Sequence, residues 1–131
     1  MLKRTLAGVF RSFEQTGEKA KDPALRTRYY KLSKDAAWEQ VVSALKKIPG
    51  MKVLHEVENI GEIVGEKKTK TGRTQDITIT LFNINPMKTA IDIYSASRGS
   101  LGDMGSNYRT ILTIFHAIDR QLGAYKMDEQ R

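Results

Sequence analysis

The segment from Ser97 to Ile111 gathers the side chains of this chain that are best suited to bind a small molecule. It reads SRGSLGDMGSNYRTI, and its charged and amide side chains are Arg98, Asp103, Asn107 and Arg109. Three glycines separate them, which favours a tight turn. The segment leads into a long run with apolar residues at helical spacing, so it also predicts a helix start, capped by Ser100 or Asp103.

Two interpretations of these side chains are open. Backbone N–H groups at a helix start attract anions, and Arg98 would add a charged donor, which predicts a pocket for a small or anionic ligand. Alternatively, Asp103 pairs with Arg98 or Arg109, and the cluster is a structural clasp. Gly, Ser, Asp and Asn commonly form turns without any ligand, which favours the clasp.

The same segment resembles the C-terminal signature of the domain of unknown function 1499 family, a set of small bacterial proteins. In that pattern, a strand with Ser and Arg leads through a glycine to an Asp-x-Gly-x-Asn step that opens a helix. The matching residues are Ser95, Ser97, Arg98, Gly99, Asp103, Gly105 and Asn107, followed by Arg109 and Ile111. The resemblance covers the last strand and the last helix, and it implies no particular activity, because the family has none that is settled.

Residues for catalysis or metal binding are scarce. The chain has no Cys, which excludes disulfides, thiolate nucleophiles and thiolate metal ligands. The two histidines, His55 and His116, have no second His or paired carboxylate at metal-ligand spacing. No nucleophile elbow, phosphate-binding glycine loop or dinucleotide motif is present. We therefore expect a non-catalytic binding domain, without a metal or a cofactor.

Positive charge is concentrated at the front of the chain. The protein carries 22 Lys and Arg against 15 Asp and Glu, a net charge of +7, and +6 of this lies in residues 1–34. The asymmetry predicts an alternative function, in which the basic first third is an interaction module for an anionic membrane surface, a nucleic acid or a protein partner. The near-neutral remainder disfavours nucleic acid among these. The cations expected to form that surface are Lys3, Arg4, Arg11, Arg26 and Arg28.

The apolar pattern predicts the elements that hold these side chains. An amphipathic helix is predicted at the N-terminus, with apolar positions Leu2, Leu6, Val9, Phe10 and Phe13. Such a short helix is marginal alone, so it must dock on its own domain, on a second copy in a homodimer, or on a membrane. The other predicted elements are a strand over 25–32, a helix capped by Ser33, strands over 51–58, 62–68, 76–82 and 87–97, and a helix over 104–122.

The order β-α-β-β-β-β-α after the first helix predicts a two-layer α+β fold. Short connections make the strands antiparallel, and two helices cover one face of a sheet of about five strands. This order is shared by TATA-box-binding-protein repeats and is similar to short helix-grip proteins. We expect an N-terminal helix and linker over 1–22, one domain over 23–124 and a polar tail over 125–131. No secretory signal or membrane-spanning run is present in the sequence, which predicts a cytoplasmic protein.

Overall fold

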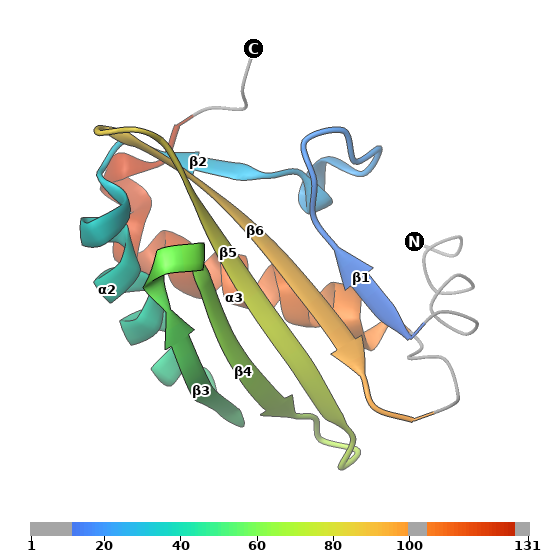
Figure 1. The fold of residues 1–131 in the computed structure, drawn as a ribbon. Coiled ribbons are helices and arrows are strands. Elements are labelled where there is room, and N and C mark those ends of the chain that lie inside the picture. The colour runs from blue at the N-terminus through green and yellow to red at the C-terminus, as the bar shows by residue number, and fades with distance from the viewer. Residues whose placement is uncertain (1–11, 100–104, 128–131) are drawn as a thin grey trace.

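The computed structural model describes residues 12–99 and 105–127 of the chain (Figure 1). Its helices and strands are β1 (Phe13–Gln15), β2 (Arg28–Tyr30), α2 (Lys34–Lys46), β3 (Met51–Val57), β4 (Glu62–Lys68), β5 (Thr74–Asn85), β6 (Lys88–Ser97) and α3 (Ser106–Leu122). Short 3₁₀ helices lie at Pro23–Leu25, Glu58–Ile60 and Gly123–Tyr125.

A six-stranded antiparallel sheet forms one layer of the molecule. Its strand order is β1-β6-β5-β4-β3, and β2 also pairs with β6. β1 and β2 follow one another along the same edge of β6, since Phe13 lies opposite Ala96 whereas Tyr30 lies opposite Thr89. Both α2 and α3 pack on one face, behind the sheet in Figure 1. The predicted two-layer α+β fold is confirmed, with one strand more than the five expected.

The core lies between this face of the sheet and the two helices. Side chains alternate between the two faces of a strand, so every second residue of β5 and β6 points toward the helices. The buried apolar residues include Ile77, Ile79, Leu81, Ile91 and Ile93 from the strands and Trp38, Val41, Leu45, Ile111, Phe115 and Ile118 from the helices. The apolar stripe predicted along each helix is therefore the surface that packs on the sheet.

The helix predicted at the N-terminus does not include Phe13. Residues Phe13–Gln15 form β1, an edge strand on β6. Glu14 is buried, whereas Phe13 is exposed and its ring centre lies 5.9 Å from that of Tyr94. This alternation is that of a strand, and pairing with β6 satisfies backbone groups on both strands. The rest of the predicted helix lies outside the described residues.

The caps of the two helices differ in kind. Ser33 caps α2 as predicted, because its Oγ accepts a hydrogen bond of 3.2 Å from the backbone N–H of Ala36. The N-cap of α3 is Gly105, with a left-handed φ of 82°, in place of the predicted Ser100 or Asp103. Glycine has no Cβ to oppose this conformation, so the chain turns sharply into the helix. Ser100 and Asp103 lie outside the described residues.

The edge strand β3 contains an irregularity. Its register with β4 shifts between Val53 and His55. As a result, Glu56 lies opposite the core residue Ile63. The Oε1 atom of Glu56 accepts a hydrogen bond of 3.0 Å from Trp38 Nε1 of α2. The bulge thus leaves the edge strand anchored to a helix through a polar contact.

The chain after α3 packs against β2. Lys126 forms an isolated bridge with Tyr30, and the backbone N–H of Met127 donates to the Tyr29 carbonyl at 2.9 Å. The Lys126 ammonium also pairs with Asp119 at 2.8 Å. These contacts connect the start of the segment predicted as a polar tail to the edge of the sheet.

Alkaline pH is expected to destabilise the protein through Tyr29. Burial, followed by the hydrogen bond of 2.6 Å that its hydroxyl donates to Glu18, raises the pKa of Tyr29 to about 12. An unfolded chain releases this proton near pH 10, so the contribution of Tyr29 to stability is complete below pH 10 and is lost as the pH rises to about 12. The loss amounts to at most about 3 kcal/mol.

The Tyr29→Phe variant isolates this effect. The free energy of unfolding of the wild-type protein, measured in urea, should fall relative to that of Tyr29→Phe between pH 10 and pH 12. A difference between the two proteins that stays constant over this range would contradict the assignment.

Candidate functional site

A cavity of about 580 Å³ lies between the β4–β5 hairpin and the first turns of α3. The residues that line it are Lys67, Thr69, Lys70, Thr71, Arg73, Ser106, Arg109, Thr110 and Thr113. Four of these side chains are cationic, the other five carry hydroxyl groups, and none is acidic. We call this space the basic cavity.

The hairpin that supplies three of the cations is held in shape by Thr69. The Thr69 backbone N–H donates to the Arg73 carbonyl at 2.9 Å, and the Gly72 N–H donates to the Thr69 carbonyl at 3.0 Å. The Thr69 hydroxyl oxygen accepts a further bond of 3.2 Å from the Arg73 N–H. These bonds close the turn, so Lys70 and Arg73 project from a defined backbone.

A buried glutamine connects the base of this hairpin to α3. Gln75 is 0% exposed, its Nε2 donates to Ser106 Oγ at 2.9 Å, and its Oε1 accepts from Thr110 Oγ1 at 2.7 Å. Both partners belong to the first two turns of α3. The two walls of the basic cavity are therefore fastened to each other by one side chain.

Two glycines of the segment from Ser97 to Ile111 leave room for the arginines of the cavity. A Cβ on Gly99 would lie 3.2 Å from Arg73 Nη2, and a Cβ on Gly105 would lie 3.2 Å from Arg109 Nη1. Both glycines have positive φ values, 120° and 82°, which other residues rarely adopt. Arg73 Nη2 also donates to the Arg98 carbonyl at 3.1 Å. The glycines thus permit both the turn and the close approach of the guanidinium groups.

Arg98 lies away from the basic cavity. Its guanidinium pairs with Asp76 at 2.7 Å and with Glu66 at 3.0 Å, and Arg98 Nε lies 3.1 Å from both carboxylate oxygens of Asp76. The hydrogen bonds to Asp76 raise the pKa of Arg98 above its ordinary value. The Arg98 guanidinium is therefore paired with acids of β4 and β5. The predicted clasp with Asp103 lies outside the described residues.

Asn107 is enclosed in the protein. It is 0% exposed, its Oδ1 accepts from Ser95 Oγ at 2.6 Å, and its Nδ2 donates to Ser97 Oγ at 2.9 Å and to the Ser12 carbonyl at 3.0 Å. This side chain joins α3 to β6 and to the residue before β1. Of the four residues predicted to bind a ligand, Arg109 lines the basic cavity, whereas Arg98 and Asn107 do not. The fourth, Asp103, is not among the described residues.

Two of the arginines predicted for surface binding, Arg26 and Arg28, donate hydrogen bonds to backbone carbonyls close to them in the sequence. Arg26 Nε donates to the Ala20 carbonyl at 3.0 Å, and Arg28 Nη2 donates to the Ala24 carbonyl at 3.1 Å. The Arg28 guanidinium lies 4.3 Å from the centre of the Phe115 ring. Both arginines line a smaller cavity of about 320 Å³. The other members of this predicted surface, Lys3, Arg4 and Arg11, lie outside the described residues.

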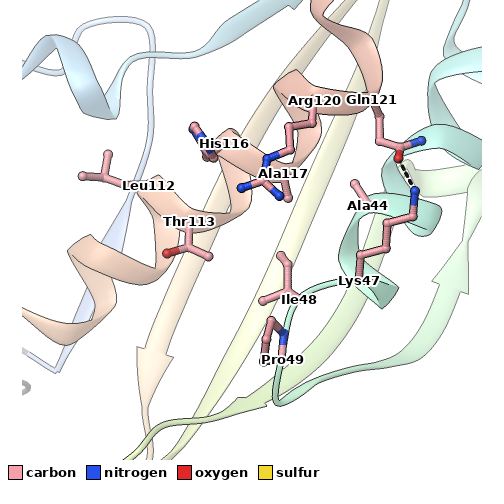
Figure 2. Close-up of a pocket in the computed structure, with 10 residues that line it drawn as sticks. All are labelled: Ala44, Lys47, Ile48, Pro49, Leu112, Thr113, His116, Ala117, Arg120 and Gln121. Carbon is pink, nitrogen blue, oxygen red and sulfur yellow. Dashed lines mark hydrogen bonds between the residues drawn. The ribbon is translucent and has the colours of Figure 1, made fainter.

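A second large space, of about 720 Å³, lies between the end of α2 and the outer side of α3. Figure 2 shows its lining, which consists of Ala44, Lys47, Ile48, Pro49, Leu112, Thr113, His116, Ala117, Arg120 and Gln121. Lys47 Nζ donates to Gln121 Oε1 at 2.7 Å across one end of the space. We call it the interhelical groove.

Sequence reasoning missed most of the basic cavity. Lys70 and Arg73 belong to a stretch whose polar, turn-rich composition predicts only a hairpin loop, and Lys67 belongs to the strand predicted over 62–68. The alternation of cations and threonines in KTKTGRT was an available signal. The proximity of this hairpin to Arg109 depends on the pairing of β5 with β6, which brings Gln75 opposite Ser97.

The described part of the chain contains neither a candidate metal site nor a candidate membrane-spanning helix. Within residues 12–99 and 105–127, no group of three His, Asp or Glu side chains is arranged to hold a metal ion. No helix there has the length and hydropathy that a membrane crossing requires.

Comparison with known proteins identifies one family and several distant structures, among them the two that follow. The model of a family described as "Protein of unknown function (DUF1499)" matches residues 9–118. A conserved protein from Geobacillus kaustophilus is 11% identical, with a TM-score of 0.41, over 79% of this chain and 97% of that one. An aromatase/cyclase, Zhui from Streptomyces sp. R1128, is 10% identical, with a TM-score of 0.34, over 86% of each chain. No curated protein matches the chain.

The Asn107→Ala substitution should destabilise the fold. It removes the partner of two buried serine hydroxyls and one backbone carbonyl, and an unsatisfied buried polar group costs about 1–3 kcal/mol. Urea unfolding followed by circular dichroism should show a loss of at least that size. Gln40→Ala, which removes an exposed amide from α2, is the control and should change the free energy of unfolding by less than about 0.5 kcal/mol. Equal losses in the two variants would contradict this role of Asn107.

Proposed function

The chain belongs to the DUF1499 family of proteins of unknown function, and from that premise we propose that it binds a small anionic ligand in the basic cavity. The observation that carries the proposal is the charge of the lining. Lys67, Lys70, Arg73 and Arg109 meet in one cavity of about 580 Å³, and none of the described residues that line it is acidic. Cations gathered in one cavity repel one another, and a bound anion relieves that repulsion.

The chemistry of the lining favours an oxyanion, such as a phosphate or a carboxylate group. Arg73 and Arg109 each present a planar fork of N–H donors that matches two oxygens of such a group, and the lysines add point charges. Ser106 and the four threonines of the lining add hydroxyl groups to the cavity. The ligand class is therefore a compact group with several oxygen acceptors and negative charge.

The same lining supports binding in preference to turnover. Among the described residues that line the cavity, there is no His, Asp or Glu that would take a proton from one of these hydroxyl groups. A serine or threonine hydroxyl is a weak nucleophile without such a base. These hydroxyls are thus suited to orient an anion.

Calorimetric titration with pyrophosphate tests the proposal. The wild-type protein should bind it, and Arg109→Gln and Lys70→Gln should each weaken binding by about tenfold, since a hydrogen bond to a charged group contributes about 1.5 kcal/mol or more. Both side chains are exposed, so the variants should fold as the wild type does. Raising the salt concentration should weaken binding in the wild type.

Lys31→Gln is the matched control for charge. Lys31 is exposed and lies outside the lining of the basic cavity, so this variant should bind pyrophosphate as the wild type does. Loss of affinity in Lys31→Gln equal to that in Arg109→Gln would show a diffuse charge effect and would overturn the proposal. So would the absence of any pyrophosphate binding by the wild type.

A further inference from the structure

We propose that the interhelical groove is a second binding site, which takes a carboxylate that carries a flat apolar ring system. The carboxylate lies between Lys47, at the end of α2, and Arg120 of α3, while the ring lies against the apolar wall of the groove. No cation of the basic cavity takes part, so this inference goes beyond the proposed function and does not depend on it.

Short side chains on both helices leave space for the groove. Ala44 of α2 and Ala117 of α3 belong to its lining, and each of these side chains is a single methyl group. Figure 2 shows Ala44 and Ile48 on the side opposite α3, and Pro49 and Leu112 extend the apolar surface. The volume of about 720 Å³ lies within the range of about 300–1,000 Å³ that is typical of small-molecule sites.

Two cations border the apolar wall. Lys47 and Arg120 line the groove from the two helices that enclose it. Lys47 Nζ donates to Gln121 Oε1 at 2.7 Å, and Gln121 Nε2 donates to Gln40 Oε1 at 2.7 Å. These amides are neutral, so they hold the ammonium group in place without cancelling its charge. None of the described residues that line the groove is acidic. A carboxylate in the groove therefore meets two positive charges.

The acidic residues of the two helices lie away from these cations. Asp119, the single acid of α3, directly precedes Arg120. Its Oδ1 accepts from the Tyr30 hydroxyl at 2.6 Å, and its Oδ2 accepts from Lys126 Nζ at 2.8 Å, so both oxygens face β2 and the chain after α3. The acids of α2 lie in its first two turns, whereas the groove is lined by the last turn of that helix and the residues that follow. Neither helix supplies a carboxylate to Arg120.

The side chains of α3 favour a flat ring over a flexible chain. His116 and Arg120 are four residues apart, so they lie on the same side of the helix, and Figure 2 shows both beside the groove. A guanidinium group is planar and stacks on the faces of aromatic rings, and imidazole is also a flat ring. An aromatic system in the groove thus contacts Ile48 on one face and Arg120 on the other. A hydrocarbon chain would cover apolar surface without such stacking.

Four compounds test the inference by calorimetric titration of the full chain. 2-Naphthoate combines the carboxylate with the flat ring, and it should bind most tightly. 2-Naphthamide has the ring without the charge and should bind at least tenfold more weakly, because it loses the charged hydrogen bonds. Decahydro-2-naphthoate keeps the charge without the flat ring, and acetate has no ring. Both should bind more weakly than 2-naphthoate.

Proton NMR locates the bound ring. The chain has two histidines, His55 on β3 and His116 in the lining of the groove, so the signals of each imidazole can be followed separately. The ring current of 2-naphthoate should shift the signals of His116 and leave those of His55 unchanged. The His116→Gln variant assigns the two sets of signals.

Two variants test the contacts of the carboxylate. Lys47→Gln and Arg120→Gln should each weaken 2-naphthoate binding by about tenfold, the effect of one charged hydrogen bond. Both side chains are exposed, and thermal unfolding should show that the variants are as stable as the wild type. Lys46→Gln is the matched control, because Lys46 is the exposed neighbour of Lys47 and lies outside the lining. It should bind 2-naphthoate as the wild type does.

Several outcomes would overturn the inference. Equal affinities for 2-naphthoate and its amide would remove the role of the cations, and equal affinities for 2-naphthoate and decahydro-2-naphthoate would remove that of the flat ring. Binding that persists in both variants and is displaced by pyrophosphate would place the ligand in the basic cavity. If 2-naphthoate does not bind, this inference fails, while pyrophosphate binding still decides the proposed function.

A second copy of the chain is the other candidate occupant of the groove. Shifts of the His116 signals that appear without ligand as the protein is concentrated, together with dimer formation in sedimentation, would assign the groove to that copy. This result would also overturn the inference. We expect the His116 signals to be independent of protein concentration and to respond to 2-naphthoate alone.

Discussion

The hydrogen bonds beneath the first turns of α3 determine where the basic cavity lies on this protein. Gln75, Ser95 and Asn107 are each 0% exposed, so their polar atoms must find partners within the protein. They do so in one arrangement, in which no buried side-chain nitrogen or oxygen of the described residues lacks a partner. Apolar packing alone would let a helix slide or rotate, whereas these bonds require a specific rotation of α3. That rotation directs Arg109 toward the β4–β5 hairpin.

The pleat of the sheet separates charges that the sequence places side by side. On β4, Glu66 precedes Lys67, and successive side chains point to opposite faces. Glu66 therefore pairs with Arg98 on the face without helices, while Lys67 lines the basic cavity. Asp76 pairs with Arg98 in the same way, whereas its neighbour Gln75 holds α3. A region of the chain with little net charge thus contains a local surplus of positive charge on one face.

The fold was predictable where a periodic pattern reports burial. The alternation in β5, around Ile77 and Ile79, and the long stripe of α3 gave the correct elements, and Ser33 gave the correct cap of α2. The strand β1 was not predictable, because three residues carry no readable period and the partner strand β6 imposes their conformation. Of the side chains that line the basic cavity, Arg109 was singled out from the sequence because it follows a glycine-rich turn. The lysines and arginine of the hairpin were missed, because their place beside α3 depends on strand pairing between residues distant in the sequence.

The two short strands along β6 have a consequence for the behaviour of the sheet in a crowded solution. An uncovered strand offers a row of backbone donors and acceptors that can template aggregation. The long edge of β6 is instead occupied by β1 over residues 94–96 and by β2 over residues 89–91. The opposite border is β3, which has a bulge after Val53 and carries the charges of Lys52 and Glu56, and both features discourage pairing with another strand. Both borders of the sheet are thereby protected against the addition of foreign strands.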